Sequence, residues 1–73
     1  MQPRSEAEVI REFPLTGLVP GWYFRVRETS AGAYEVEGTD LYSRRVRRTG
    51  TDPDVLLNDC VRDAATIAGR ERA

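Results

Sequence analysis

Residues 22–28 read WYFRVRE, and their side chains alternate between two faces. Trp22, Phe24 and Val26 fall on one face, and Tyr23, Arg25 and Arg27 fall on the other. A period of two with aromatic and branched residues is typical of a half-buried β-strand. Turn sequences flank the stretch, Pro20-Gly21 before it and Ser30-Ala31-Gly32 after it. The sequence therefore predicts a strand here, with its aromatic face toward a core.

A second strand can be paired with the first strand, residue by residue. We expect residues 30–32 to form a three-residue loop, with Gly32 at the left-handed position that such loops require. The apolar residues then meet on one face and opposite charges meet on the other, an agreement that favours a hairpin. The expected partners are Thr29 with Ala33, Val26 with Val36, Arg27 with Glu35, and Arg25 with Glu37.

A third strand is expected after a turn at residues 40–43. Placing Val46 opposite Val36 also places Arg45 opposite Glu37 and Arg47 opposite Glu35. The polar face then carries two charged rows, and each cross-strand pair contributes up to about 1 kcal/mol. A longer loop at residues 40–43 is the alternative, because Tyr42 suits a left-handed position poorly. That loop would shift the register of the third strand.

An amphipathic helix is predicted over residues 53–68. Asp52 or Thr51 can cap it, and Pro53 suits the first helical position. Gly69 is a typical stop, which leaves residues 69–73 as a frayed tail. The apolar face of this helix carries Leu57, Cys60, Val61, Ala64 and Ala68, flanked by Leu56 and Ile67.

Residues 1–14 are expected to form a flap on the main core. Ser5 and Glu8 fit a capping box, which predicts a short helix with Val9, Ile10 and Phe13 on one side. A strand with Val9, Arg11 and Phe13 on one face is the alternative. Pro14 ends the segment in either case.

These elements predict a single α+β domain spanning residues 1–73. Its architecture is a three-stranded antiparallel β-meander, residues 22–49, packed on one C-terminal α-helix in the order β-β-β-α. The expected core anchors are Trp22, Phe24, Val26, Tyr34, Val36, Val46, Leu57, Cys60, Val61 and Ala64.

Composition excludes several kinds of chemistry. The 73 residues include no histidine and one cysteine, Cys60, so the chain alone forms no disulfide and no Cys/His zinc site. Cys60 also has no histidine to activate it as a nucleophile. We expect no enzyme and no cofactor. The chain shows no signal-peptide pattern and no membrane-spanning stretch, which predicts a cytoplasmic protein.

The candidate binding face is the polar face of the sheet, with Tyr23, Arg25, Arg27, Arg45 and Arg47. We expect the four arginines to be engaged by Glu35 and Glu37, while Arg44 and Arg48 lie at the rim of the core face. Flanking arginines keep both carboxylates ionised, which does not suit a general acid. The formal net charge of −1 gives no overall attraction to nucleic acid or membrane.

From Phe24 to about Ile67 the chain resembles the N-terminal domain of HicB-type antitoxins. The shared features are residues 24–28 (FRVRE), a turn at Gly32, residues 34–37 (YEVE), residues 39–41 (TDL), residues 48–52 (RTGTD) and a helix that opens with residues 55–57 (VLL). The resemblance implies this architecture and a tendency to self-associate. It carries over no functional residue, because residues 42–44 (YSR) stand where that family has Pro-Gly-Cys.

The function we expect is that of a small non-catalytic protein-binding or accessory module. It is antitoxin-like and self-associating, with a homodimer or another protein as partner. A chain this short buries only about 60% of its unfolded surface, so help from a partner subunit would stabilise it. The alternative is a nucleic-acid-binding module that uses the arginine-rich face. We expect no membrane and no small-molecule substrate.

Overall fold

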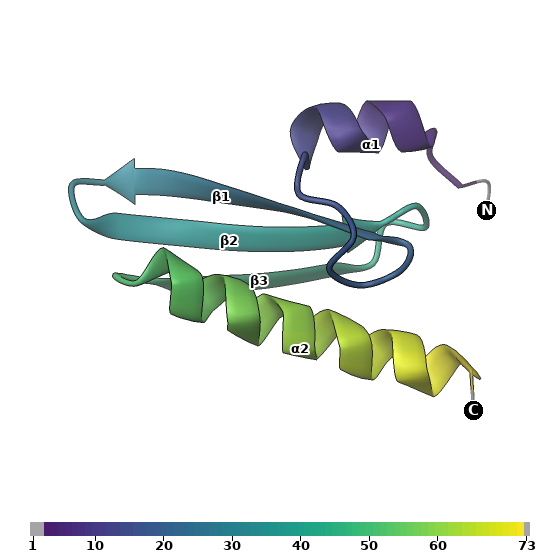
Figure 1. The fold of residues 1–73 in the computed structure, drawn as a ribbon. Helices are drawn as coiled ribbons and strands as arrows, with labels where there is room; N and C mark the ends of the chain where they lie inside the picture. Colours follow the sequence, from purple (N-terminus) through teal and green to yellow (C-terminus); the bar gives the residue numbers. More distant parts are fainter. Residues whose placement is uncertain (1–2, 73) are drawn as a thin grey trace.

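The structure is a computed structural model and describes residues 3–72, with side chains to residue 70. It confirms the predicted α+β fold, a β-β-β-α meander preceded by a short helix. A three-stranded antiparallel sheet in the order β1-β2-β3 lies between the two helices (Figure 1). Residues 1, 2 and 73, the ends of the expected flap and tail, lie outside the described residues. The elements are α1 (Glu6–Glu12), β1 (Trp22–Ser30), β2 (Ala33–Asp40), β3 (Arg45–Gly50) and α2 (Pro53–Arg72).

Helix α2 packs across one face of the sheet and forms the main core. It lies against β2 and β3 far more than against β1, one of the two edge strands (Figure 1). The prediction that Val26 is a core anchor was therefore wrong. Its side chain points to the helix side of β1, but the residue is 41% exposed. The other nine expected anchors are buried or packed against the core. The buried cluster is Val19, Trp22, Phe24, Val36, Leu56, Cys60 and Ala64, with Tyr34, Val46, Leu57 and Val61 partly buried against it.

Helix α1 packs on the opposite face of the sheet, so the expected flap on the main core was wrong. The helix prediction for this segment is confirmed. Val9, Phe13 and Tyr23 form a second buried cluster. Ile10 is exposed, and Ser5 makes no side-chain capping bond, so the capping box is not formed. The sheet is therefore covered by a helix on each face.

The first hairpin has the predicted register over most of its length. Val26 faces Val36, and both predicted Arg–Glu pairs are cross-strand neighbours. Gly32 has φ +75°, as its turn position requires. The partner predicted for Thr29 was wrong, because Ser30 faces Ala33 and the strand is irregular between Glu28 and Ser30.

The predicted register of β3 was wrong by two residues. Val46 faces Gly38, and Arg47 faces Glu37. The register of β3 slips, as the alternative allowed, because Ser43 and not Tyr42 takes the left-handed position, with φ +70°. The carboxylate of Asp40 fixes this loop, since its Oδ1 accepts the backbone N–H groups of Tyr42 and Arg44 at 2.9 Å each. A loop of residues 41–43 therefore sets the pairing.

Helix α2 begins as predicted and ends later. Asp52 caps it by accepting the backbone N–H groups of Asp54 and Val55 at 3.1 and 3.3 Å. The predicted stop at Gly69 was wrong, because the helix continues to Arg72. One glycine costs a helix only about 1 kcal/mol relative to alanine, so an established helix can pass through it.

Candidate functional site: an arginine-covered sheet face

Four arginines and two glutamates cover the part of the sheet that α1 leaves open. We call this surface the arginine face. Its side chains project from β1, β2 and β3 on the side of the sheet that carries α1, because alternate residues of a strand share a face. The arginine face consists of Arg25 and Arg27 from β1, Glu35 and Glu37 from β2, and Arg45 and Arg47 from β3.

Each glutamate is shared by two arginines, one from each neighbouring strand. Glu37 pairs with Arg25 at 2.8 Å and with Arg45 at 3.4 Å. Glu35 pairs with Arg27, and with Arg47 at 3.6 Å. The two predicted charged rows are therefore present as ion pairs. On the β3 side these pairs run diagonally across the strands, because long arginine side chains span the two-residue shift.

The carboxylates lie beneath the guanidinium groups. The Glu35 and Glu37 side chains are 10% and 12% exposed, whereas the Arg27 and Arg47 side chains are 58% and 67% exposed. The hydrogen bond and charge of Arg25 hold the pKa of Glu37 below its usual value, and burial opposes this effect. The surface therefore presents positive charge outward, with the carboxylates underneath.

The end of α1 forms one border of the arginine face. The guanidinium carbon of Arg25 lies 4.5 Å from the centre of the Phe13 ring, and that of Arg45 lies 5.9 Å from it. Such cation–π contacts fix the position of a guanidinium group. Phe13 was expected only as part of the flap, because no local pattern shows which face of the sheet α1 covers.

Tyr23 does not belong to this surface, so its assignment to the candidate binding face was wrong. It is 6% exposed beneath α1, and its hydroxyl donates a hydrogen bond to the carboxylate of Glu6. That hydrogen bond and burial raise the pKa of Tyr23 to about 12. Tyr23 therefore joins α1 to the sheet and offers nothing to a ligand.

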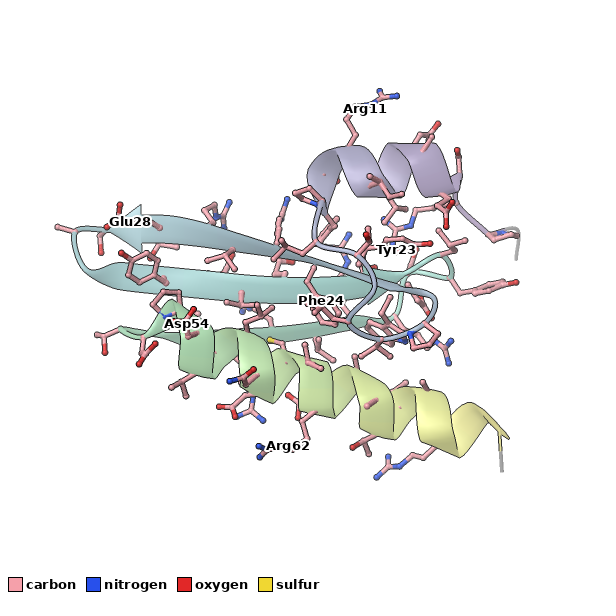
Figure 2. All side chains as sticks on the ribbon, in the orientation of Figure 1. Arg11, Tyr23, Phe24, Glu28, Asp54 and Arg62 are labelled. Carbon is pink, nitrogen blue, oxygen red and sulfur yellow. The ribbon has the colours of Figure 1, made fainter. Side chains whose placement is uncertain are left out.

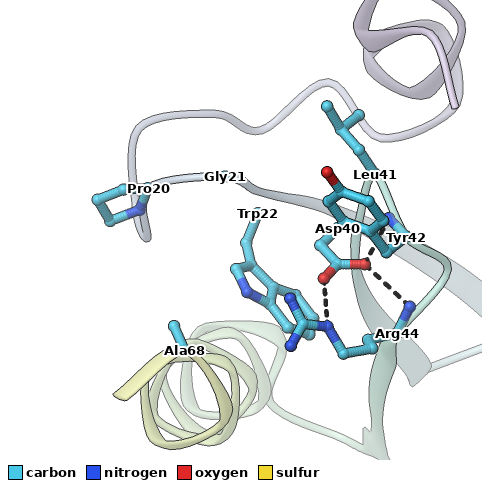
Figure 3. Close-up of a pocket in the computed structure, with 8 residues that line it drawn as sticks. All are labelled: Pro20, Gly21, Trp22, Asp40, Leu41, Tyr42, Arg44 and Ala68. Atoms are coloured by element: carbon cyan, nitrogen blue, oxygen red, sulfur yellow. Dashed lines mark hydrogen bonds and ion pairs between the residues drawn. The ribbon is translucent and has the colours of Figure 1, made fainter. Parts of the chain in front are cut away.

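A pocket of about 240 Å³ lies beside the loop between β2 and β3 and was not expected from the sequence (Figure 3). Both oxygens of Asp40 are used, Oδ1 by the loop and Oδ2 by the side chain of Arg44. No local sequence signal could have identified this pocket, because its walls come from three distant segments. It is lined by Pro20, Gly21, Trp22, Asp40, Leu41, Tyr42, Arg44 and Ala68.

The remaining candidate groups have structural roles. Cys60 is fully buried against Val36, whose carbonyl oxygen lies 3.4 Å from its Sγ, and burial raises its pKa to about 11. Arg48 projects to the helix side, where its Nε donates to Asp63 of α2 at 2.9 Å. Among the side chains that the structure describes, those of residues 3–70, no group of three or more His, Cys, Asp or Glu is placed to hold a metal ion.

A comparison of the chain with protein-family models, curated proteins and solved structures finds no match in any of the three. Among the described residues, neither helix is both long and apolar enough to cross a membrane.

Proposed function

We propose that this protein is a small non-catalytic protein-binding module and that the arginine face is its binding surface. The observation that carries the proposal is the layering of exposed guanidinium groups over nearly buried carboxylates. Glu35 and Glu37 hold the arginines in position before any partner arrives. A side chain that is already ordered loses less entropy on binding. Arginine is also enriched at interfaces and binds carboxylates through two parallel hydrogen bonds.

The pKa values of two side chains, Glu37 and Cys60, support a non-catalytic role. A general acid needs a raised pKa, whereas Arg25 lowers the pKa of Glu37. The reactive form of cysteine is the thiolate, and a pKa of about 11 disfavours that form for Cys60 at neutral pH. A binding role requires neither a carboxyl group with a raised pKa nor a reactive thiolate.

Self-association forms part of the proposal. A chain of 73 residues buries only a small core by itself, so a partner subunit would add to its stability. The resemblance to HicB-type antitoxins is consistent with an antitoxin-like, homodimeric module. We place the protein in the cytoplasm, where a free thiol such as Cys60 stays reduced.

Nucleic-acid binding is the second candidate function. Four arginines against two glutamates leave the arginine face with two extra positive charges, which favours contact with phosphates. A specific site typically neutralises about 6–10 phosphates, more than this surface offers. We therefore expect only non-specific binding that is lost at physiological salt. Titration of DNA and RNA at low and physiological salt checks this prediction. Salt-resistant submicromolar binding that drops on Arg45→Ala and Arg47→Ala would make this the better account.

The proposal is tested with an arginine-face variant and a matched control. Arg27→Gln/Arg47→Gln removes two exposed charges from the arginine face, and Arg62→Gln removes one from the outer side of α2 (Figure 2). Tagged proteins are used to capture partners from host extracts, and their masses are measured by sedimentation equilibrium. A partner or dimer that is lost only with the double variant supports the proposal. Equal capture and equal mass for all three proteins would contradict it.

A further inference from the structure

We infer that the open edge of β3 accepts an extended peptide segment with carboxylates at alternate positions, which pairs as a fourth strand. This inference rests on the proposed protein-binding function and names the chemistry of the partner. Strand addition takes its affinity from backbone hydrogen bonds and its specificity from alternate side chains. The edge of β3 offers both.

The backbone of β3 has one side available for pairing. Its pairing with β2 includes a hydrogen bond from the Asp40 N–H to the Arg44 carbonyl oxygen. In an antiparallel ladder such pairs alternate, so Val46 and Arg48 also point their backbone groups toward β2. The N–H and C=O groups of Arg45, Arg47 and Thr49 therefore point outward. Within the described residues, β3 is an edge strand with no neighbour on that side.

The guanidinium groups of Arg45 and Arg47 at this edge are paired only in part by the carboxylates of β2. Arg45 and Arg47 reach Glu37 and Glu35 at 3.4 and 3.6 Å, compared with 2.8 Å for Arg25 and Glu37. Each guanidinium has five N–H donors, and about half or more of each side chain is exposed. Carboxylates on a strand beyond β3 would meet these donors from the other side.

Strand β2 shows the pattern that suits this edge. Its carboxylates, Glu35 and Glu37, are two residues apart and lie on the arginine face. They serve Arg45 and Arg47, which are also two residues apart. A partner segment that reads Glu-x-Glu would repeat this arrangement on the outer side of β3. The spacing of two follows from the strand period, so adjacent carboxylates would not serve both arginines.

The other occupants of a sheet edge fit less well. A second copy of β3 would bring arginines opposite arginines, and like charges directly opposite destabilise a strand pair. At the β1 edge, Leu15 already makes two backbone hydrogen bonds to Phe24. A nucleic acid can meet the guanidinium groups but has no peptide groups to extend the ladder. An acidic extended segment satisfies both the backbone and the side chains.

The probe is an acetylated and amidated peptide with the sequence of residues 33–40, AYEVEGTD. One control peptide has both glutamates replaced by glutamine, and a second, AEEYVGTD, has the same composition with its two glutamates adjacent and no carboxylates two residues apart. Binding to the full chain is measured by fluorescence anisotropy. Amide hydrogen exchange of Arg45, Arg47 and Thr49 reports backbone pairing. A DNA duplex at the same salt concentration is the nucleic-acid arm.

Three variants separate charge from strand addition. Arg45→Gln/Arg47→Gln removes the charge and is expected to weaken peptide binding about tenfold, as two exposed ion pairs would. Thr49→Pro keeps every arginine but removes an outward N–H, and is expected to weaken binding about tenfold. Arg62→Gln should bind as the wild type does. Circular dichroism melting checks that each variant is folded.

The inference is supported if the probe binds better than both control peptides, if Thr49→Pro weakens it, and if the outward amides become protected. Binding that depends on the arginines but is unchanged in Thr49→Pro would overturn strand addition and leave the proposed function standing. Equal binding of AEEYVGTD, tighter binding of the DNA duplex, or no binding of any peptide at millimolar concentration would overturn the inference as well.

Discussion

Replacement of Gly38 by alanine is expected to destabilise the protein, because a side chain there has no room. Gly38 lies in the central strand, opposite Phe24 on β1 and Val46 on β3. A Cβ at this position would lie 2.5 Å from Cε1 of the Phe24 ring and 3.0 Å from Cγ2 of Val46. The flat ring thus occupies the space over the glycine. The conflict is steric, since Gly38 is not among the glycines with positive φ.

The size of the effect follows from these distances. Carbon atoms in contact lie about 3.5–4.0 Å apart, so the Phe24 ring would have to move by about 1 Å. Phe24 is fully buried, so the movement passes to its neighbours. Overpacking of this kind costs about 1–3 kcal/mol. Alanine also lowers the conformational entropy of the unfolded chain, which stabilises the folded state by about 0.4–1 kcal/mol and offsets part of this cost. For a domain this small, each kcal/mol of net loss lowers Tm by about 4–8 °C.

Gly69→Ala is the matched control, since it makes the same chemical change in open space. Apart from the backbone of its own helix, no described heavy atom lies within 4 Å of a Cβ at that position in α2. Alanine should therefore stabilise the helix by up to about 1 kcal/mol. Both variants are measured by thermal and urea unfolding followed by circular dichroism. Adding Phe24→Leu to Gly38→Ala should cost less than the sum of the two single changes, because the smaller side chain relieves the clash.

A Gly38→Ala variant that melts at or above the wild-type temperature, while Gly69→Ala is stabilised as expected, would contradict this prediction. That result would mean that the Phe24 ring does not cover Gly38. Strict additivity of Gly38→Ala and Phe24→Leu would point the same way.

The other predictions concern the core and the ionised groups. Trp22→Ala should lower the free energy of unfolding by about 3–5 kcal/mol, because Trp22 is almost fully buried; an unchanged Tm in thermal melts would place it outside the core. Cys60 should react slowly with iodoacetamide at pH 8, since its pKa is about 11 and its side chain is buried; labelling at the rate seen in denaturant would contradict this. The pKa of Glu37 is lowered in the folded state, so its contribution to stability is present at neutral pH and is lost as pH falls through that folded value. Urea unfolding at pH 7 and pH 3 should therefore show a smaller loss of stability for Glu37→Gln than for the wild type, and equal losses would refute it.

The sequence by itself determined the features that depend on near neighbours along the chain. The alternation of residues 22–28 is visible without any structure, because a strand has a period of two. The turn at Gly32 pairs Arg25 with Glu37 and Arg27 with Glu35, since one short loop sets the register of a hairpin. The Asp52 cap and the first turn of α2 follow from local hydrogen bonding. The four arginines of the candidate face were identified for the same reason.

Only the tertiary structure decided how the helices divide the two faces of the sheet. Tyr23 alternates with Trp22 as an outward residue should, yet α1 covers it, because Val9 and Phe13 need a surface to bury against. Val26 has the pattern of a core residue and stays exposed, because one helix is too narrow to cover three strands and α2 lies over β2 and β3. The register of β3 depended on the loop that Asp40 ties together. Periodicity tells which side chains share a face, but the choice of what covers that face depends on contacts between residues far apart in the chain.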